Sequence, residues 1–154
     1  LPVLFVCENN LYAMGTALRI SESVTEIARK AEAYDVPSAA VDGMDVLAVR
    51  EAGMEAVKYV REGDGPFLLE MKTYRYRGHS MSDPGKYRTA EEIEERKKTD
   101  PIIRAERDLR AAGATDVDFE ALDAEIEKVV EDAVAFADES PEPGEELIEA
   151  YTYA

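Results

Sequence analysis

The chain is short of the residues from which several common kinds of site are built. It has one cysteine, one histidine and no tryptophan, which excludes a disulfide within one chain and a zinc site of the usual cysteine and histidine spacing. No apolar run approaches the roughly 18 to 20 residues that span a bilayer. The sequence also has no Walker loop and no Gly-x-Gly-x-x-Gly fingerprint, so these two nucleotide-binding motifs are excluded.

Basic residues are few as well. There are 18 of them against 34 acidic residues, which gives a formal net charge of −16. Such a surface repels nucleic acid and anionic membranes, so we expect neither as a partner. The acidity lies mainly in residues 89–154, with 21 of the acidic and 7 of the basic residues. A local basic cluster persists before it, at Lys72, Arg75, Arg77, Lys86 and Arg88.

The first residues predict a buried parallel strand. The run Val3–Cys7 is β-branched, aromatic and aliphatic, and it stops in the polar segment Glu8–Tyr12. Ligands in open α/β sheets gather just beyond the carboxyl ends of such strands, so we expect Asn9 and Asn10 at a ligand site. We expect Cys7 to be a packed, reduced thiol. A parallel strand this early needs neighbours and a crossover, which indicates part of a larger domain.

The pattern that follows alternates helices and strands. It predicts a helix from a capping box at Ser23–Glu26 to about Tyr34, a strand over residues 37–41, a helix from the cap Asp45 to Gly63, and a strand over residues 66–71. This order favours an α/β fold with a parallel sheet and flanking helices.

The remainder is predicted to be a long loop followed by helices. Residues 73–89 have no periodicity and combine aromatic, cationic and hydroxyl side chains, which is typical of a functional loop. Helices are expected to start at Thr89 and at Asp100-Pro101. A further helix near residues 118–138 has an apolar stripe that we interpret as packing surface. Residues 147–153 are expected to form a short edge strand or an extended tail.

Two positions are candidates for chemistry. The side-chain oxygen of Asn10 and the carbonyl oxygen of Tyr12 are hard ligands that suit magnesium, although adjacent asparagines after a strand are also common turn residues. His79 lies in the basic loop, where it could contact a phosphate or donate a proton, or be an ordinary loop histidine. Ser80 and Ser82 have no base and acid to complete a hydrolase triad.

Two segments together resemble a known family. Residues 7–15, Cys-Glu-Asn-Asn-Leu-Tyr-Ala-Met-Gly, and residues 73–89, which include Arg-Gly-His-Ser-Met-Ser-Asp-Pro-Gly, are similar to alpha subunits of the pyruvate dehydrogenase type. These belong to the thiamine-diphosphate-dependent 2-oxoacid dehydrogenase family. The resemblance covers nearly the whole chain, in a register that begins midway through the family's cofactor-binding domain. It implies that residues 1–88 are the second half of that domain, with an active-site loop at 73–89, and that residues 89–154 are a helical carboxyl-terminal extension.

The resemblance also implies site residues. Thiamine diphosphate is bound in this family through Mg²⁺, with Asn10 and the carbonyl of Tyr12 as metal ligands and Met14 as the side chain that supports the bent cofactor. His79 matches the active-site histidine near the diphosphate and the substrate, and is the catalytic candidate. The family's upstream Gly-Asp-Gly segment, which supplies a carboxylate ligand, does not precede Asn10 here, so we do not expect the chain alone to be active.

The implied activity is oxidative decarboxylation of pyruvate with transfer of the acetyl group to lipoyl groups. Implied partners are a beta subunit, in a heterotetramer, and a lipoyl-bearing acetyltransferase component, in the cytoplasm or, in a eukaryote, the mitochondrial matrix. Alternatives are an alpha subunit acting on branched-chain 2-oxoacids or acetoin, and a noncatalytic interaction module.

Overall fold

The computed structural model describes residues 1–152, which form two compact units divided after Leu109. The first unit contains the sheet, and the second contains the long helix of the acidic part. The expected division after residue 88 falls inside the first unit, and the domain boundaries of the family's cofactor-binding domain stay a prediction.

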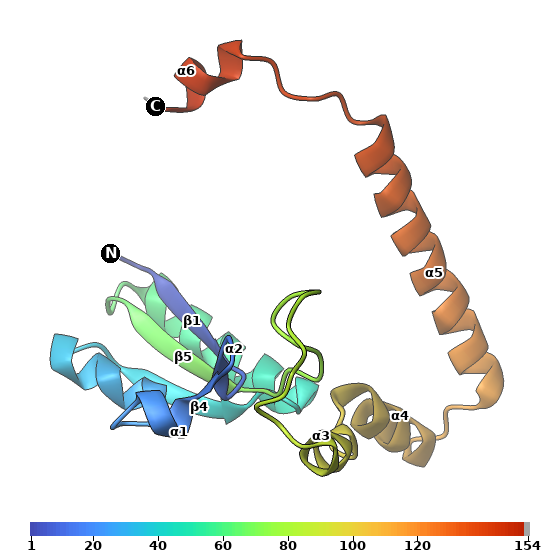
Figure 1. Cartoon of the computed structure of the whole chain (residues 1–154), viewed down its shortest axis with the longest axis horizontal. Coiled ribbons are helices and arrows are strands. Elements are labelled where there is room, and N and C mark those ends of the chain that lie inside the picture. Colours follow the sequence, from blue (N-terminus) through green and yellow to red (C-terminus); the bar gives the residue numbers. More distant parts are fainter. Residues whose placement is uncertain (153–154) are drawn as a thin grey trace. The chain divides into compact units, whose positions relative to one another are not determined.

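The first unit is built on a parallel three-stranded sheet (Figure 1). Its strands are β1 (Leu4–Asn9), β4 (Ser38–Asp42) and β5 (Phe67–Lys72), in the order β1-β5-β4. Lys72 pairs with Asn9 on one side and with Asp42 on the other. The three carboxyl ends therefore lie side by side at one edge of the sheet, and the predicted parallel α/β fold is confirmed.

Helices cover both faces of this sheet. One face presents Leu4, Leu69 and Met71 toward α2 (Val46–Glu62), and the alternate residues Phe5 and Leu68 lie beside η1 (Ile27–Tyr34). This alternation follows from the two-residue period of strands. The result is a three-layer arrangement, as expected for a parallel sheet.

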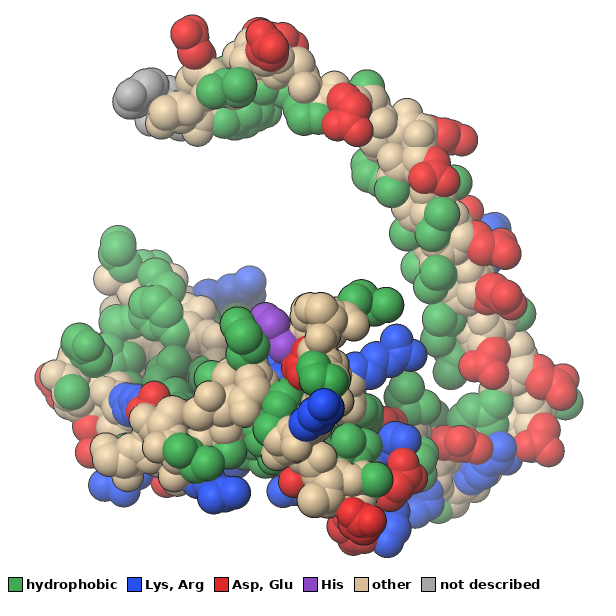
Figure 2. Space-filling view, viewed as in Figure 1, with side chains coloured by type: hydrophobic (Ala, Val, Ile, Leu, Met, Phe, Trp, Pro, Cys, Tyr) green, Lys and Arg blue, Asp and Glu red, His purple; other side chains and the backbone are tan. Residues whose placement is uncertain are grey.

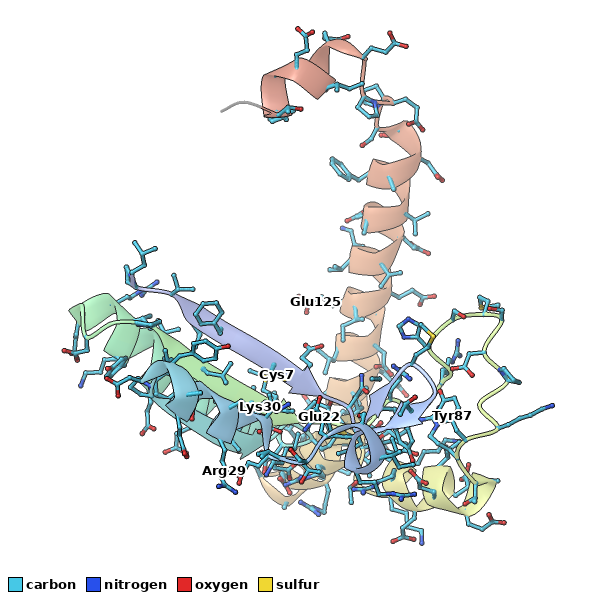
Figure 3. The ribbon with its side chains drawn as sticks, turned by 60° about the vertical axis from the view of Figure 1, so that its left-hand side comes forward. Cys7, Glu22, Arg29, Lys30, Tyr87 and Glu125 are labelled. Carbon is cyan, nitrogen blue, oxygen red and sulfur yellow. The ribbon has the colours of Figure 1, made fainter. Side chains whose placement is uncertain are left out.

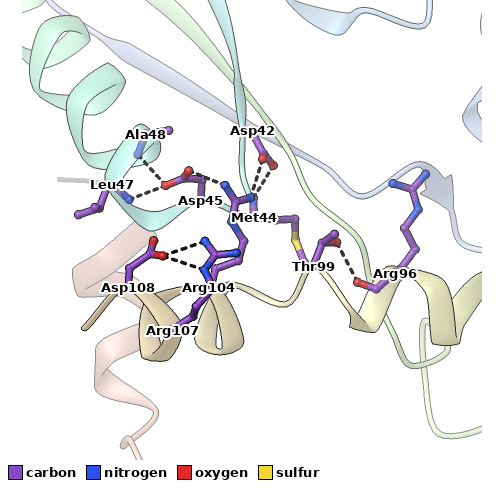
Figure 4. Close-up of polar contacts among 10 residues, drawn as sticks. All are labelled: Asp42, Met44, Asp45, Leu47, Ala48, Arg96, Thr99, Arg104, Arg107 and Asp108. Atoms are coloured by element: carbon purple, nitrogen blue, oxygen red, sulfur yellow. Dashed lines mark hydrogen bonds and ion pairs between the residues drawn. The ribbon is translucent and has the colours of Figure 1, made fainter. Parts of the chain in front are cut away.

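The helix after β4 begins and ends where the sequence predicts. The carboxylate of Asp45 accepts hydrogen bonds from the backbone N–H groups of Leu47 and Ala48, at 3.0 and 3.1 Å (Figure 4). Gly63 ends α2 in the left-handed region, with φ of 91°, which glycine adopts at no steric cost. Local cap chemistry is therefore sufficient to define α2.

The predicted capping box at Ser23–Glu26 is wrong. The helix is a 3-10 helix that starts at Ile27, and its N-cap residue Glu26 makes no side-chain cap hydrogen bond. Instead the carboxylate of Glu70, on β5, accepts a hydrogen bond from the backbone N–H of Ala28 at 2.7 Å. A carboxylate from strand β5 thus replaces the expected local cap. The helix ends at Tyr34, as predicted.

Glu70 is the main polar group under η1. It is fully buried, and its other oxygen accepts a 2.6 Å hydrogen bond from the side-chain amide of Asn9. Cys7 lies nearby as a partly buried free thiol, and burial together with the charge of Glu70 raises its pKa. A raised pKa disfavours the reactive thiolate, in agreement with a packed, reduced cysteine.

Short elements connect β1 to η1. Strands β2 (Tyr12–Ala13) and β3 (Thr16–Ala17) form a small antiparallel hairpin, and α1 (Leu18–Ser21) follows it. None of the three was expected, because two-residue strands and a four-residue helix carry no periodic pattern.

Two helices of the acidic part start at the predicted caps. Thr89 accepts a hydrogen bond from the N–H of Glu92 at 3.1 Å at the start of α3 (Ala90–Lys97), and Asp100 accepts one from Ile102 at 2.8 Å at the start of α4 (Pro101–Ala111). Arg104 of α4 donates to Asp42 at 2.8 Å and to Asp45 at 2.6 Å (Figure 4). These two hydrogen bonds, which we call the Arg104 fork, attach α4 to the turn between β4 and α2.

The second unit contains α5 (Asp116–Glu139) and α6 (Glu146–Thr152). The expectation of a strand or extended tail over residues 147–153 is wrong as far as residue 152, and Tyr153 lies outside the described residues. Backbone N–H groups of Leu147 and Ile148 bond to the carbonyls of Gly144 and Glu145, both at 3.1 Å. A helical turn satisfies these groups locally, whereas an edge strand would need a sheet beside it.

The stripe predicted on the long helix is present. Figure 2 shows hydrophobic side chains along one side of α5 and acidic ones along the other. Ile126, Val129 and Phe136 are 52%, 62% and 75% exposed, so the packing role of the stripe stays a prediction. No helix within residues 1–152 combines the length and apolar character needed to cross a membrane.

Candidate functional site

The candidate site begins with two turns at the end of β1. The side-chain oxygen of Asn9 accepts a hydrogen bond from the N–H of Leu11 at 3.1 Å, and that of Asn10 accepts one from Tyr12 at 3.2 Å. Leu11 takes a positive φ of 71°. Both asparagines therefore act as turn residues. An amide oxygen has two acceptor positions, so Asn10 keeps one for another partner.

The hairpin places two oxygen atoms on the same side. Leu18 donates to the carbonyl of Leu11 at 2.8 Å, which makes the opposed residues Tyr12 and Ala17 a non-hydrogen-bonded pair. The N–H and carbonyl of Tyr12 consequently point away from β3. Because the Tyr12 N–H is bound by Asn10, the side-chain oxygen of Asn10 and the carbonyl oxygen of Tyr12 face the same side of the hairpin.

A tyrosine cluster holds the loop against this hairpin. We define it as Tyr12, Tyr74 and Tyr87, whose rings lie 5.5, 5.5 and 5.3 Å from the guanidinium of Arg88. Figure 3 labels Tyr87 in the loop. Arg88 is buried and donates to three successive backbone carbonyls, those of Arg75, Tyr76 and Arg77. Cation–π contacts and these hydrogen bonds together fix both ends of the loop.

One carboxylate joins two of these tyrosines. Glu92 Oε1 accepts hydrogen bonds from the hydroxyls of Tyr12 and Tyr74, both at 2.8 Å. Burial, with Glu92 beside it, raises the pKa of Tyr12 to about 12. Burial alone would raise the pKa of Glu92, but the two hydroxyls and the charges of Arg88 and Arg96 outweigh it and the pKa is lowered. Glu92 is therefore ionised and the tyrosines are neutral near pH 7.

The loop around His79 is organised by Asp83. Its carboxylate accepts hydrogen bonds from the hydroxyl of Tyr87 at 2.7 Å, from the N–H of His79 at 2.7 Å and from the N–H of Gly85 at 2.8 Å. These bonds lower the pKa of Asp83 to about 2, and the bond from Tyr87 has the largest effect. A side chain at Gly78 would come within 2.7 Å of the Asp83 carbonyl oxygen, so this tight loop requires glycine there.

Arg75 brings the two predicted segments together. Its Nη2 donates to the carbonyl of Met14 at 2.9 Å and to the hydroxyl of Tyr87 at 3.4 Å. Its Nη1 lies 3.5 Å from Nδ1 of His79. Met14 and His79 are both exposed. The hairpin after β1 and the loop after β5 thus meet at one guanidinium, beside the carboxyl edge of the sheet.

The structure places the four predicted residues in this one region. Asn10 and Tyr12 are joined by a hydrogen bond, Met14 and His79 each contact Arg75, and Tyr12 and Tyr87 are in ring contact at 5.3 Å. Ser80 and Ser82 are exposed, with their hydroxyl oxygens 3.0 Å apart. No group of three or more His, Cys, Asp or Glu side chains within residues 1–152 is arranged for a metal ion. A metal here would therefore depend on the two oxygens already described and on ligands from elsewhere.

Sequence reasoning did not find the residues that organise the site. Strand β5 ends at Lys72, so Arg75 and Arg77 lie in the loop that follows it. Arg75 is partly buried and Arg77 is exposed. The roles of Asp83 and Glu92 were missed, although the repeated tyrosines and arginines of residues 74–88 were a signal of an ordered cluster.

Comparison with known proteins identifies the family. The pyruvate dehydrogenase E1 component subunit alpha of Zymomonas mobilis is 47% identical over 153 residues, covering 99% of this chain and 43% of that protein. The Rhizobium meliloti subunit of the same name is 44% identical, covering 99% of this chain and 44% of that protein. The human mitochondrial somatic form is 45% identical, covering 100% of this chain and 40% of that protein. The chain spans about two fifths of the length of these relatives. The model of the family described as "Dehydrogenase E1 component" matches residues 1–146, and the chain belongs to that family.

Proposed function

We propose that the chain is the carboxyl-terminal part of a pyruvate dehydrogenase E1 alpha subunit, which takes part in decarboxylating pyruvate and transferring the acetyl group to a lipoyl group. The names of the relatives support this assignment at 44% to 47% identity. The observation that carries it is the meeting of Met14 and His79 at Arg75. Residues that the resemblance assigns to one cofactor, more than sixty positions apart, lie around a single side chain.

The residues present fit a magnesium diphosphate. Asn10 and Tyr12 offer an amide and a carbonyl oxygen on the same side of the hairpin, and oxygen ligands of this kind suit Mg²⁺. Met14 and His79 are exposed beside them, as side chains that contact a bound cofactor must be before it binds. The guanidinium of Arg75 lies beside Met14 and His79, and its positive charge favours an anionic diphosphate there.

Each residue then has a distinct role. Asn10 and Tyr12 would hold the metal, Met14 would support the cofactor, and Arg75 would set the distance between the hairpin and the loop. His79 would act at the substrate side, where its ring can hold or donate a proton. Thiamine diphosphate, when bound, supplies the electron sink that the decarboxylation of a 2-oxoacid requires.

The site also needs groups from outside this chain. The resemblance assigns a carboxylate ligand to an upstream segment. In addition, Phe5 and Val6, which lie on opposite faces of β1, are 52% and 51% exposed. Apolar side chains this exposed on a parallel strand indicate that further structure packs there. We propose that this further structure comes from the rest of the alpha subunit and from a beta subunit, and that the chain alone is therefore inactive. We also propose that a lipoyl-bearing component receives the acetyl group. The proposed location is the cytoplasm or the mitochondrial matrix.

The test uses the full-length alpha subunit with its beta subunit. We expect thiamine diphosphate binding to depend on Mg²⁺ and pyruvate to be decarboxylated faster than branched-chain 2-oxoacids. Acetoin, which has no carboxylate to lose, should be cleaved more slowly than pyruvate is decarboxylated. Asn10→Ala should weaken Mg²⁺ binding, while Asn10→Asp, which keeps an oxygen, should retain more of it. Glu94→Ala, on the exposed side of α3, is the matched control. Unchanged Mg²⁺ affinity in Asn10→Ala, or a preference for another substrate, would overturn the corresponding assignment.

A further inference from the structure

We infer that Glu92 is a positioning residue, which holds Tyr12 so that its carbonyl oxygen can bind the metal. This inference rests on the proposed function, because it concerns the proposed metal ligands Asn10 and Tyr12. Nothing in the sequence pattern assigns Glu92 a role beyond the first turn of α3.

The contact is direct and long-range. The hydroxyl of Tyr12 donates to Glu92 Oε1 at 2.8 Å across 80 residues of sequence, and the hydroxyl of Tyr74 donates to the same oxygen at 2.8 Å. Hydrogen bonds to a carboxylate are about twice as strong as those between neutral groups. One oxygen atom therefore joins the hairpin after β1 to the segment after β5.

Glu92 is itself held in place. It lies in the first turn of α3, where its N–H donates to the hydroxyl of Thr89 at 3.1 Å. Tyr74, which shares its carboxylate, is 6% exposed, and the Arg88 guanidinium lies 5.5 Å from the ring of Tyr12 and 5.5 Å from that of Tyr74. The acceptor for Tyr12 is thus part of a rigid element packed against a buried cluster.

The hairpin needs such an anchor. Strands β2 and β3 have two residues each, and the turn that joins them contains Met14 at a positive φ of 56°, while Leu11 precedes β2 at 71°. Positive φ is unfavourable for residues other than glycine and persists only where neighbouring structure enforces it. With Glu92 removed, the Tyr12 hydroxyl loses its acceptor and the backbone between Asn10 and Met14 loses a fixed point.

The experiment compares Glu92→Ala, Glu92→Gln and Tyr12→Phe in the full alpha and beta assembly. Calorimetric titration with Mg²⁺ at saturating thiamine diphosphate measures metal affinity, and amide exchange of the Tyr12 hairpin measures its order. Loss of groups that orient metal ligands commonly weakens metal binding by about 10- to 100-fold, and we expect Glu92→Ala to fall at the lower end. The catalytic rate at saturating Mg²⁺ should change much less than the Mg²⁺ requirement.

Two comparisons separate positioning from general destabilisation. Glu92→Gln keeps an acceptor oxygen and should restore most of the Mg²⁺ affinity, and Tyr12→Phe, which keeps the ring, should reproduce the effect of Glu92→Ala. Glu94→Ala, which removes a carboxylate that pairs with Lys97 at the surface, is the control and should match the wild type. If Glu92→Ala does not fold, Tyr12→Phe and Glu92→Gln still provide the test.

The outcomes distinguish this inference from the proposed function. Mg²⁺-dependent cofactor binding in the wild type, with unchanged Mg²⁺ affinity and unchanged hairpin exchange in Tyr12→Phe, would overturn the role of Glu92 alone. No Mg²⁺-dependent binding of thiamine diphosphate by the wild-type assembly would overturn the proposed function and, with it, this role.

Discussion

The side-chain amide of Asn9 donates a 2.6 Å hydrogen bond to the carboxylate of Glu70, which has no exposed surface. The other oxygen of Glu70 accepts the N–H of Ala28. Through this one side chain, the end of β1 and the start of η1 are both attached to β5. The turn that presents Asn10 therefore rests on a buried polar network, whose members are costly to remove singly.

Removing this carboxylate should destabilise the fold. In Glu70→Ala, the donors on Asn9 and Ala28 stay buried without an acceptor, and a buried unsatisfied group costs about 1–3 kcal/mol. Urea unfolding of the full-length protein should show a lowered midpoint. Glu62→Ala, at the exposed end of α2, should leave the midpoint close to that of the wild type. An unchanged midpoint in Glu70→Ala would show that the network contributes little to stability.

Alanine substitutions at Gly43 and Gly53 should change stability in opposite directions. A Cβ at Gly43 would lie 2.5 Å from Cγ2 of Thr73 and 3.0 Å from the Lys72 carbonyl oxygen, so we expect Gly43→Ala to cost about 1–3 kcal/mol by overpacking. Gly53, inside α2, has no atom within 4 Å of the added Cβ. Gly53→Ala should be neutral or gain about 0.5–1 kcal/mol from helix propensity. Thermal unfolding of both variants checks the opposite signs.

The fork of Arg104 predicts a pH dependence. The hydrogen bond from Arg104 lowers the pKa of Asp42 below its ordinary value. A lowered pKa in the folded state contributes stability above the unfolded pKa, near 4, and this stability is lost as the pH falls through the folded pKa. Arg104→Met should therefore lower the urea midpoint modestly at pH 7, because the pair is partly exposed, and the difference from the wild type should shrink toward pH 3.

The control for this fork is Arg107→Met. Arg107 is mostly exposed and pairs with its neighbour Asp108. The Arg107→Met variant should have the same urea midpoint as the wild type at pH 7 and at pH 3. A difference between Arg104→Met and the wild type that stays constant with pH would mean that packing of the arginine stem, and not its charge, attaches α4.

The loop around His79 should depend on Asp83. In Asp83→Asn one acceptor oxygen is replaced by a donor, so the bonds from His79, Gly85 and Tyr87 cannot all persist. We expect faster amide exchange across residues 78–87 and little change in β5. Because the pKa of Asp83 is about 2, loop protection in the wild type should hold at pH 5 and weaken only as the pH falls from about 4 toward 2. Lys86→Ala, an exposed position, serves as control.

The helix boundaries could be predicted because their causes are local. Asp45 and Thr89 each bond to N–H groups two or three residues ahead, and Gly63 ends α2 by its own backbone angle. The same holds for Asn10, whose turn involves only Tyr12. Signals of this range are complete within a short stretch of sequence.

The apolar runs and the polar residues that follow them were also enough to indicate a parallel sheet with a ligand site at its carboxyl edge. What the residue order could not reveal is which distant groups meet there. Glu70 replaces a local cap across 42 residues, Arg75 reaches Met14 across 61, and Glu92 reaches Tyr12 across 80. These contacts depend on the packing of strands and loops in three dimensions, because a carboxylate or guanidinium has no sequence signal that names its partner. Local hydrogen bonding therefore defined the elements, and only their packing assembled the site.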